Sequence, residues 1–324
     1  MFHPSGLNRI SVTLILVIAI ISLGLIALIE LAAASPRAQA PASAPANAVA
    51  AQAEAARVRR YWTPERMANA RPLQLVLDEG GEPSLRFGRP APIAGASFLT
   101  IGTPEVPPYS FNGRIFIRVG DKHGYCSGTA IDSPTRQLVL TAGHCVNAGA
   151  EYRGNLWYRD LLFVPAYTAG RAPLGGFAAR HNKIFAPPQW TNRSNSDYDV
   201  GAFLTHPNHR GIDVADAVGG GAAIALGLTR RQRFASFGYP GNVNRMQGCN
   251  SPYVGDDRLS FPLPGPPTMA IRCRWAPGAS GGAWLIEDGT QINGLNSYLH
   301  VNDPDRTYSP YFSRETVGKL VAGF

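Results

Sequence analysis

A histidine and a serine with neighbours suited to nucleophilic catalysis lie far apart in the chain. His144 follows the apolar run Leu138–Thr141, and Ser280 lies in the glycine-rich turn Gly278–Gly282. Because a serine hydroxyl is a poor nucleophile at neutral pH, it needs a nearby base, an acid that orients the base, and hydrogen-bond donors for the oxyanion. The two segments predict two members of a hydrolytic triad, with His144 as the base and Ser280 as the nucleophile.

The third member is expected among the aspartates between these two residues. Asp199 stands where a polar loop enters the apolar strand Val200–Leu204. Its carboxylate can therefore be buried and still hold the second ring nitrogen of His144. We expect Asp199 to be the triad acid. Asp197, which has the same strand parity, and Asp213 stay open as alternatives.

The glycines around Ser280 suit the remaining role. Because Gly278 lacks a Cβ, its backbone can adopt a conformation in which its N–H and the N–H of Ser280 point to the same position. An oxyanion hole requires this arrangement of donors. The same turn matches the Gly-x-Ser-x-Gly elbow of α/β-hydrolases, whose acid and histidine both follow the serine. His300 is the one histidine after Ser280, and the order of the candidates is His, Asp, Ser, which excludes the elbow.

The composition favours an all-β protein. Glycine (35) and proline (27) interrupt helices and suit many short strands over the 324 residues. Short apolar segments between turn residues predict two β units, each a barrel or sandwich, followed by a short helix over Ser313–Phe324. The predicted strands are Phe98–Ile101, Gly113–Val119, Gly128–Ile131 and Leu138–Thr141, then Gln232–Gly238, Met269–Arg274, Gly282–Ile286 and Ile292–Tyr298.

The N-terminal region has the composition of an export signal. Residues Ile10–Ile29 are almost wholly apolar and long enough to span a bilayer, whereas Ala32–Ala34 and Ala38–Ala40 offer small-residue cleavage sites. A cleaved signal peptide and a signal-anchor both stay open for residues 1–34. Either one exports the rest of the chain, to the periplasm or the exterior, with or without an anchor.

Residues 35–93 are expected to be a linker and a possible propeptide. Their first part, residues 35–57, is rich in alanine and proline, which favours an extended or disordered tether. A short helix is expected to begin at Thr63 and Pro64. The segment is either a propeptide or an arm packed on the body of the protein.

Four cysteines in an exported chain predict two disulfides, because none of them lies in a C-x-x-C pair. The pairing Cys126–Cys145 and Cys249–Cys273 keeps each bridge local. Each bridge would contribute roughly 3 kcal/mol by the loop-entropy estimate.

The sequence predicts no metal, no cofactor and no nucleic-acid partner. The net charge of +8 is scattered, with no basic run interleaved with aromatic residues, so it indicates a solvated surface. His206 and His209 have no nearby acidic or cysteine residues that would complete a metal site, and we expect them in a surface loop.

Three blocks of the sequence resemble the active-site blocks of the trypsin/chymotrypsin-like serine peptidases, in particular bacterial secreted members related to the glutamyl endopeptidase (V8-like) branch. The blocks are Thr141–Cys145, Asp199–Val200 before an apolar strand, and Gly278–Gly282. The resemblance covers residues 95–320. It implies two antiparallel β-barrels with the active site in the cleft between them. We place the first barrel at residues 94–210 and the second at residues 211–324.

The resemblance also implies roles for residues around the site. Cys126–Cys145 is similar to the bridge that fixes the histidine loop in the first barrel. Gly294–Tyr298 is similar to the strand that lines the cleft and pairs with the substrate backbone. Asn296, Ser297 and Tyr298 are therefore expected to bind substrate. Ser297 is also expected to lie near the triad aspartate.

The chain departs from the family pattern at several positions. Trypsin-like zymogens carry an aspartate immediately before the serine, and Ala279 stands there. That activation switch is absent, so removal of residues 35–93 would have to act differently, for example by uncovering the cleft. Arg274 stands where trypsin-like enzymes keep a carboxylate, which argues against basic substrate residues through charge repulsion. Asn296 stands where the glutamyl-specific branch has a histidine, and Leu299 stands where it has a small residue. We therefore assign the pocket no preferred substrate residue.

The sequence as a whole predicts an exported, monomeric serine endopeptidase that acts on polypeptides through an acyl-enzyme. Contact with a membrane would be limited to residues 10–29 if the signal is retained. A membrane-tethered binding protein that cleaves little stays open, because Leu299 would narrow the primary pocket. An esterase with the same triad is the other alternative.

Overall fold

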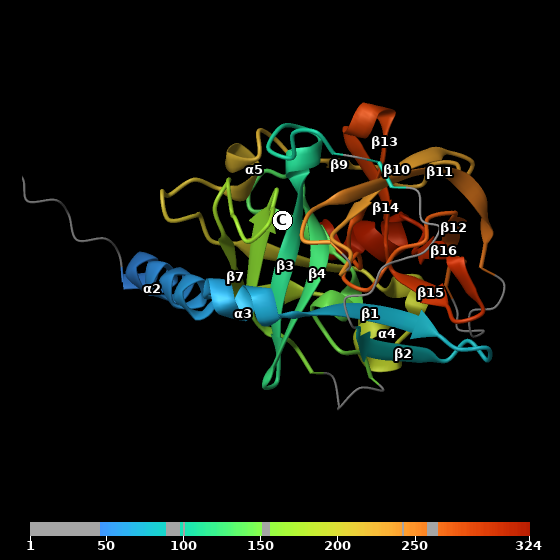
Figure 1. Ribbon diagram of the computed structural model, residues 1–324, viewed down its shortest axis with the longest axis horizontal. Coiled ribbons are helices and arrows are strands. Elements are labelled where there is room, and N and C mark those ends of the chain that lie inside the picture. Colours follow the sequence, from blue (N-terminus) through green and yellow to red (C-terminus); the bar gives the residue numbers. More distant parts are fainter. Residues whose placement is uncertain (1–45, 89–97, 100, 151–155, 242, 258–264) are drawn as a thin grey trace, which may run out of the picture. The chain divides into compact units, whose positions relative to one another are not determined.

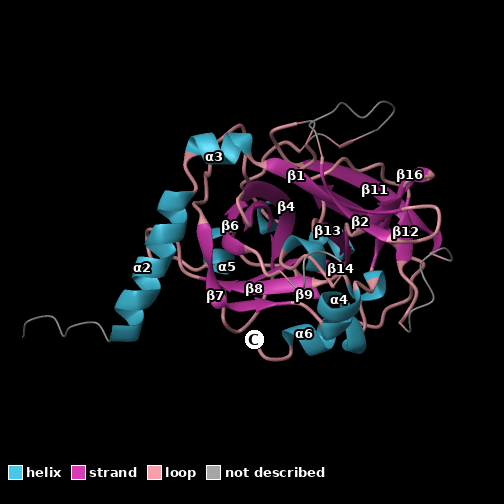
Figure 2. Cartoon of the chain, turned by 90° about the horizontal axis from the view of Figure 1, so that it is seen from below, coloured by secondary structure: helices cyan, strands magenta, loops and turns pink. Residues whose placement is uncertain are grey.

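The computed structural model describes residues 46–88, 98–99, 101–150, 156–241, 243–257 and 265–324. Figure 1 and Figure 2 show that they fold mainly as β-strands joined by turns and a few helices. The all-β prediction is confirmed.

Six strands of the N-terminal half close into a barrel. They are β3 (Asn112–Val119), β4 (Lys122–Ala130), β5 (Leu138–Thr141), β6 (Arg159–Pro165), β7 (Phe177–Phe185) and β8 (Gly201–Thr205). The strand order is β3-β6-β7-β8-β5-β4, and the β3–β4 hairpin closes the ring. Apolar side chains that alternate along the strands, such as Ile115, Phe163 and Phe203, are fully buried in its core.

The C-terminal half supplies the second barrel. Its strands are β9 (Ala223–Ile224), β10 (Arg233–Gly238), β11 (Gln247–Asp256), β12 (Met269–Ile271), β13 (Ala283–Ile286), β14 (Gln291–Leu295), β15 (Tyr298–His300) and β16 (Asp303–Ser309). They pair in the order β15-β16-β12-β11-β10-β13-β14-β9. Met269, Ile271 and Trp284 lie in its core. The predicted boundary at residue 210 falls between β8 and β9.

A strand from the N-terminal region joins the two barrels. Strand β1 (Arg71–Leu77) pairs in parallel with β4 through its first two residues and with β15 through its last three. A second strand, β2 (Pro83–Phe87), covers the other edge of β1 as an antiparallel hairpin partner. In Figure 1, β1 runs from its contact with β4 to its contact with β15. Residues 71–87, expected to belong to a linker, are therefore part of the folded sheet.

The helices are α2 (Ala46–Tyr61), α3 (Pro64–Asn69), α4 (Pro188–Arg193), α5 (Val214–Ala217) and α6 (Lys319–Val321). Thr63 caps α3 as predicted, since its hydroxyl accepts a hydrogen bond from the Arg66 N–H. A π-turn over Arg314–Gly318 leads into α6, and together they form the predicted C-terminal helix. Within the described ranges no helix is both long and apolar enough to cross a membrane. The apolar segment at residues 10–29, and with it the predicted signal over residues 1–34, lies outside them.

The predicted extended tether is wrong over residues 46–57, which belong to α2. Alanine has the highest helix propensity, and one face of this helix finds a surface to pack on. Ala55, Val58 and the following Trp62 recur at helical spacing and are at most 3% exposed. The indole N–H of Trp62 donates to the backbone carbonyl of Asp160 in β6, so the segment is anchored to the first barrel.

The structure also corrects the expectations for His206 and for the predicted strand Phe98–Ile101. His206 is buried, not part of an exposed loop, because α2 covers it and Glu54 Oε2 lies 3.0 Å from its Nε2. The predicted strand Phe98–Ile101 is reduced to a single bridge between Leu99 and Gly248, with residue 100 outside the described part.

Candidate active site

His144 and Asp199 lie together at the edge of the first barrel. His144 is in a short 3-10 turn after β5, and Asp199 directly precedes β8, which is the neighbour of β5. The His144 Nδ1 lies 2.8 Å from Asp199 Oδ2, and the backbone N–H of His144 donates to Asp199 Oδ1 at 2.7 Å. Both side chains are fully buried. The carboxylate therefore fixes the position of the ring and of the turn that carries it.

Other neighbours complete the surroundings of Asp199. The Ser297 hydroxyl donates to Asp199 Oδ2 at 2.5 Å, as the family resemblance implied. Gly143 is required beside it, because a Cβ there would come within 2.9 Å of both Asp199 Oδ1 and the Trp190 ring. These contacts fix the position of the Asp199 carboxylate beside His144.

The other two aspartates do not reach His144. Asp197 lies in the 3-10 turn Ser196–Tyr198, where it is buried on the side of Gly265. Asp213 precedes α5 and accepts a hydrogen bond from the Gln137 amide. Among the three candidates, the structure brings only Asp199 together with the histidine.

Asp197 provides a prediction about stability. Burial, with the nearby Asp257 carboxylate as a second cause, raises the pKa of Asp197 from 3.8 to about 6. A carboxyl whose pKa is raised by folding stabilises the fold in its protonated form, and this contribution is lost as the pH rises through 6. Asp197→Asn should therefore be more stable than wild type by about 1–2 kcal/mol at pH 8, with the gain vanishing near pH 4. Urea unfolding at both pH values measures it, and the exposed Asp121→Asn serves as the control.

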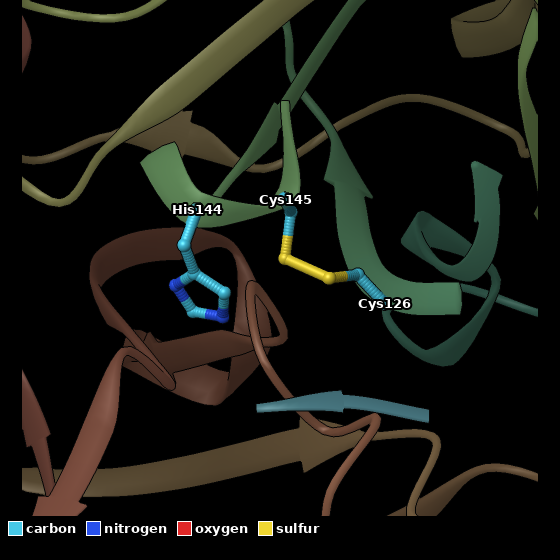
Figure 3. Close-up of side chains that lie close together, drawn as sticks. All are labelled: Cys126, His144 and Cys145. Carbon is cyan, nitrogen blue, oxygen red and sulfur yellow. A yellow bond between two sulfur atoms is a disulfide. The ribbon is translucent and has the colours of Figure 1, made fainter. Parts of the chain in front are cut away.

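Both predicted disulfides, Cys126–Cys145 and Cys249–Cys273, are present. The first ties β4 to the turn that carries His144, as the labelled side chains in Figure 3 show. Cys126, His144 and Cys145 are close enough to resemble a metal-ligand cluster, but both sulfurs are already bonded to each other. The bridge therefore holds the histidine turn.

The serine turn lies between β12 and β13 of the second barrel. Gly278 has a φ of +97°, a conformation that favours glycine, and a Cβ there would approach the Tyr239 carbonyl to 2.7 Å. Gly281 has a φ of +81°, and a Cβ on it would collide with the Thr141 hydroxyl and the Ser127 carbonyl. These glycines allow the turn to pack against the β4 and β5 strands of the first barrel.

The hydroxyl of Ser280 is directed at β1. Ser280 Oγ lies 3.3 Å from the backbone oxygen of Leu73, and the Gly278 N–H donates to the same oxygen at 2.8 Å. The His144 Nε2 is buried and makes no hydrogen bond with any described residue. The structure therefore contains the His144–Asp199 pair, while the serine hydroxyl bonds to a backbone carbonyl.

A small cavity of about 10 Å³ lies beside Ser280. Its lining includes Trp275, Asn296, Leu299, Thr307 and, from β1, Gln74, and none of the described residues that line it is charged. The sequence placed Asn296, Ser297, Tyr298 and Leu299 here, and all four line the cavity. Arg274 does not, because its guanidinium is partly exposed and lies 3.4 Å from the Asp305 carboxylate.

Strand β1 is the part of the site that sequence reasoning missed. The alternation of Leu73, Leu75 and Leu77 is a strand signal, and all three are at most 1% exposed. The pattern indicates a strand with a buried face. It does not indicate which strands that face will meet.

Solved structures of bacterial serine proteases resemble this chain. The protease Anisep from Arthrobacter nicotinovorans is 28% identical over 66% of this chain and 96% of its own, with a TM-score of 0.57. The thermostable serine protease AL20 from an extremophilic microorganism is 27% identical over the same shares, with a TM-score of 0.59. A Glu endopeptidase, 19% identical over 70% of this chain and 95% of its own, shares the fold with a TM-score of 0.55.

No protein-family model matches the chain, and no curated protein matches it. This chain covers 96% of the length of Anisep and of AL20, at 28% and 27% identity, and the TM-scores of 0.57 and 0.59 indicate the same fold. The chain is thus related to the trypsin/chymotrypsin-like serine peptidases of bacteria.

Proposed function

We propose that this protein is an exported serine endopeptidase. The observation that carries the proposal is the pairing of His144 with Asp199 at 2.8 Å, beside a serine turn whose Gly278 N–H and Ser280 hydroxyl meet on one carbonyl oxygen. Acyl transfer needs such a base, an orienting carboxylate, a nucleophile and an oxyanion donor in one place.

The proposed reaction assigns one step to each residue. Ser280 Oγ bonds to the peptide carbonyl carbon while His144 Nε2 takes the hydroxyl proton. The N–H groups of Gly278 and Ser280 stabilise the oxyanion that forms. His144 then gives the proton to the leaving amine as the C–N bond breaks. Water hydrolyses the acyl-Ser280 ester by the same proton route.

The small cavity beside Ser280 is the proposed primary pocket. Because no charged side chain lines it among the described parts of the chain, these residues offer no counter-charge to an acidic or basic substrate residue. Export is proposed on the two disulfides, which persist in oxidising compartments.

A fluorophosphonate probe tests the proposal. The full chain should react covalently with the probe, at least after the N-terminal segment is displaced, and Ser280→Ala should not react. Intact mass analysis would locate the adduct. Cleavage of an unfolded protein separates a peptidase from an esterase, which would turn over only esters. Absence of labelling in every form of the wild-type protein would leave the binding-protein alternative.

A further inference from the structure

The backbone carbonyl of Leu73 lies where the proposed reaction needs its oxyanion. Its oxygen accepts hydrogen bonds from the Gly278 N–H at 2.8 Å and from the Ser280 hydroxyl at 3.3 Å. A hydrogen-bond donor aimed at the oxyanion must be free when substrate arrives. No substrate carbonyl can take this place while Leu73 holds it.

The base is also without a hydrogen-bond contact to the nucleophile. His144 is fully buried, and its Nε2 has no hydrogen-bond partner among the residues in the described ranges. General-base catalysis requires this nitrogen within hydrogen-bond reach of the serine hydroxyl. With Ser280 bonded to Leu73, the nucleophile and the base are not engaged with each other.

Strand β1 also takes the edge that a peptide substrate would use. Leu75, Val76 and Leu77 pair in parallel with Tyr298, Leu299 and His300 of β15. A peptide bound by strand addition gains its affinity from these main-chain groups. The β15 edge is therefore occupied along its whole length.

The register of β1 differs from that of a cleavable peptide. The residue whose side chain enters the primary pocket is the one whose own carbonyl is attacked. Gln74 lines the cavity, but the carbonyl that accepts a hydrogen bond from the Gly278 N–H belongs to Leu73, the residue before it. One residue of β1 lines the pocket and a different residue places its carbonyl at the Gly278 N–H. Strand β1 is therefore bound without a peptide bond in the position for cleavage.

Helix α2 and the Trp62 that follows it anchor the chain just before β1. In α2, Glu54 lies within 3.0 Å of His206, and Arg57 pairs with Asp160 at 2.7 Å. Trp62 is buried against the first barrel. Because β1 follows this anchored segment directly, its effective concentration at the cleft is high.

We infer that β1 is a built-in inhibitor, and that the protein is latent until residues 71–77 leave the cleft. The inference rests on the proposed peptidase function. It also explains how a chain with Ala279 before the serine can be held inactive, since the block lies in the cleft itself.

A cut between β1 and β2 tests this inference. The connecting turn Asp78–Glu82 is mostly exposed, and a recognition sequence for a site-specific cysteine protease can be inserted there in the full chain. After cutting and dilution, the rate of fluorophosphonate labelling at Ser280 should rise at least tenfold over the uncut protein. The matched control carries a scrambled insert at the same turn and receives the same protease.

A second variant keeps the test decisive if the cut fragment stays bound. Val76→Pro removes an N–H from the part of β1 that lies between β15 and β2, and proline is not tolerated between two paired strands. It should raise labelling of the uncut chain by a similar factor. A synthetic peptide of residues 71–77 should then slow labelling again and remain intact.

The outcomes separate the two claims. Equal labelling of uncut, cut and Val76→Pro proteins would overturn the inhibitor role and leave the peptidase function standing. Cleavage of the added peptide would overturn the blocking register. No labelling in any form, with release of the fragment shown by gel filtration, would contradict the peptidase function and with it the inference.

Discussion

Asp199→Asn should lower the turnover of peptide substrates by about 10⁴-fold while leaving the protein folded. Asparagine has the shape of aspartate, but it carries no charge to stabilise the imidazolium of His144. Its amide nitrogen would also compete with the ring N–H at the 2.8 Å contact. The measurement is kcat/KM on a peptide substrate, with the protein freed from β1 by the cut described above.

Asp197→Asn is the matched control, because it makes the same chemical change two residues away in the same buried turn. It should keep kcat/KM within about twofold, since Asp197 makes no contact with His144. If the two variants lost activity equally, or if only Asp197→Asn did, the assignment of Asp199 would be wrong.

The second large effect concerns stability and centres on Asn296. Its Oδ1 accepts hydrogen bonds from Ser236 Oγ and Trp284 Nε1, at 2.9 and 2.7 Å. Its Nδ2 donates to the carbonyl oxygens of Phe237 and Ala279, at 2.9 and 3.2 Å. The side chain is 2% exposed and joins β10, β13 and the serine turn. It therefore acts as a buried structural link as well as lining the pocket.

Asn296→Leu should reduce the free energy of unfolding by about 4 kcal/mol, because it leaves several buried polar groups unpaired at roughly 1–3 kcal/mol each. Urea denaturation measures the loss. The exposed Asn302→Leu makes the same change in side chain and should alter stability by less than about 0.5 kcal/mol. A loss for Asn296→Leu no larger than that of the control would show that the hydrogen bonds do not stabilise the fold.

Much of the site was predictable because its catalytic residues lie in short, recognisable sequence patterns. A histidine after an apolar strand, an aspartate before one and a serine among glycines each need only a few neighbours to be recognised. The local disulfide pairing followed similarly from short separations along the chain. Fold class followed from turn-rich composition and short apolar runs, which few architectures accommodate.

The sequence favoured Asp199 as the triad acid but could not exclude Asp197, and the reason is specific. The two have equal parity if the segment is extended, but residues Ser196–Tyr198 form a 3-10 turn. Because of this turn, the carboxylates of Asp197 and Asp199 point in different directions. The pairing of β5 with β8 then decides which of them contacts His144.

The sequence by itself determined the reactive residue types, their order and the all-β class, because these depend on side-chain chemistry and local backbone preference. Tertiary structure alone decided what covers the site. The alternation of Leu73, Leu75 and Leu77 specifies a strand, but its pairing with β4 and β15 joins residues about 50 and more than 200 positions apart. Such long-range pairing depends on the whole assembled sheet, and it puts the Leu73 carbonyl on Gly278 and Ser280.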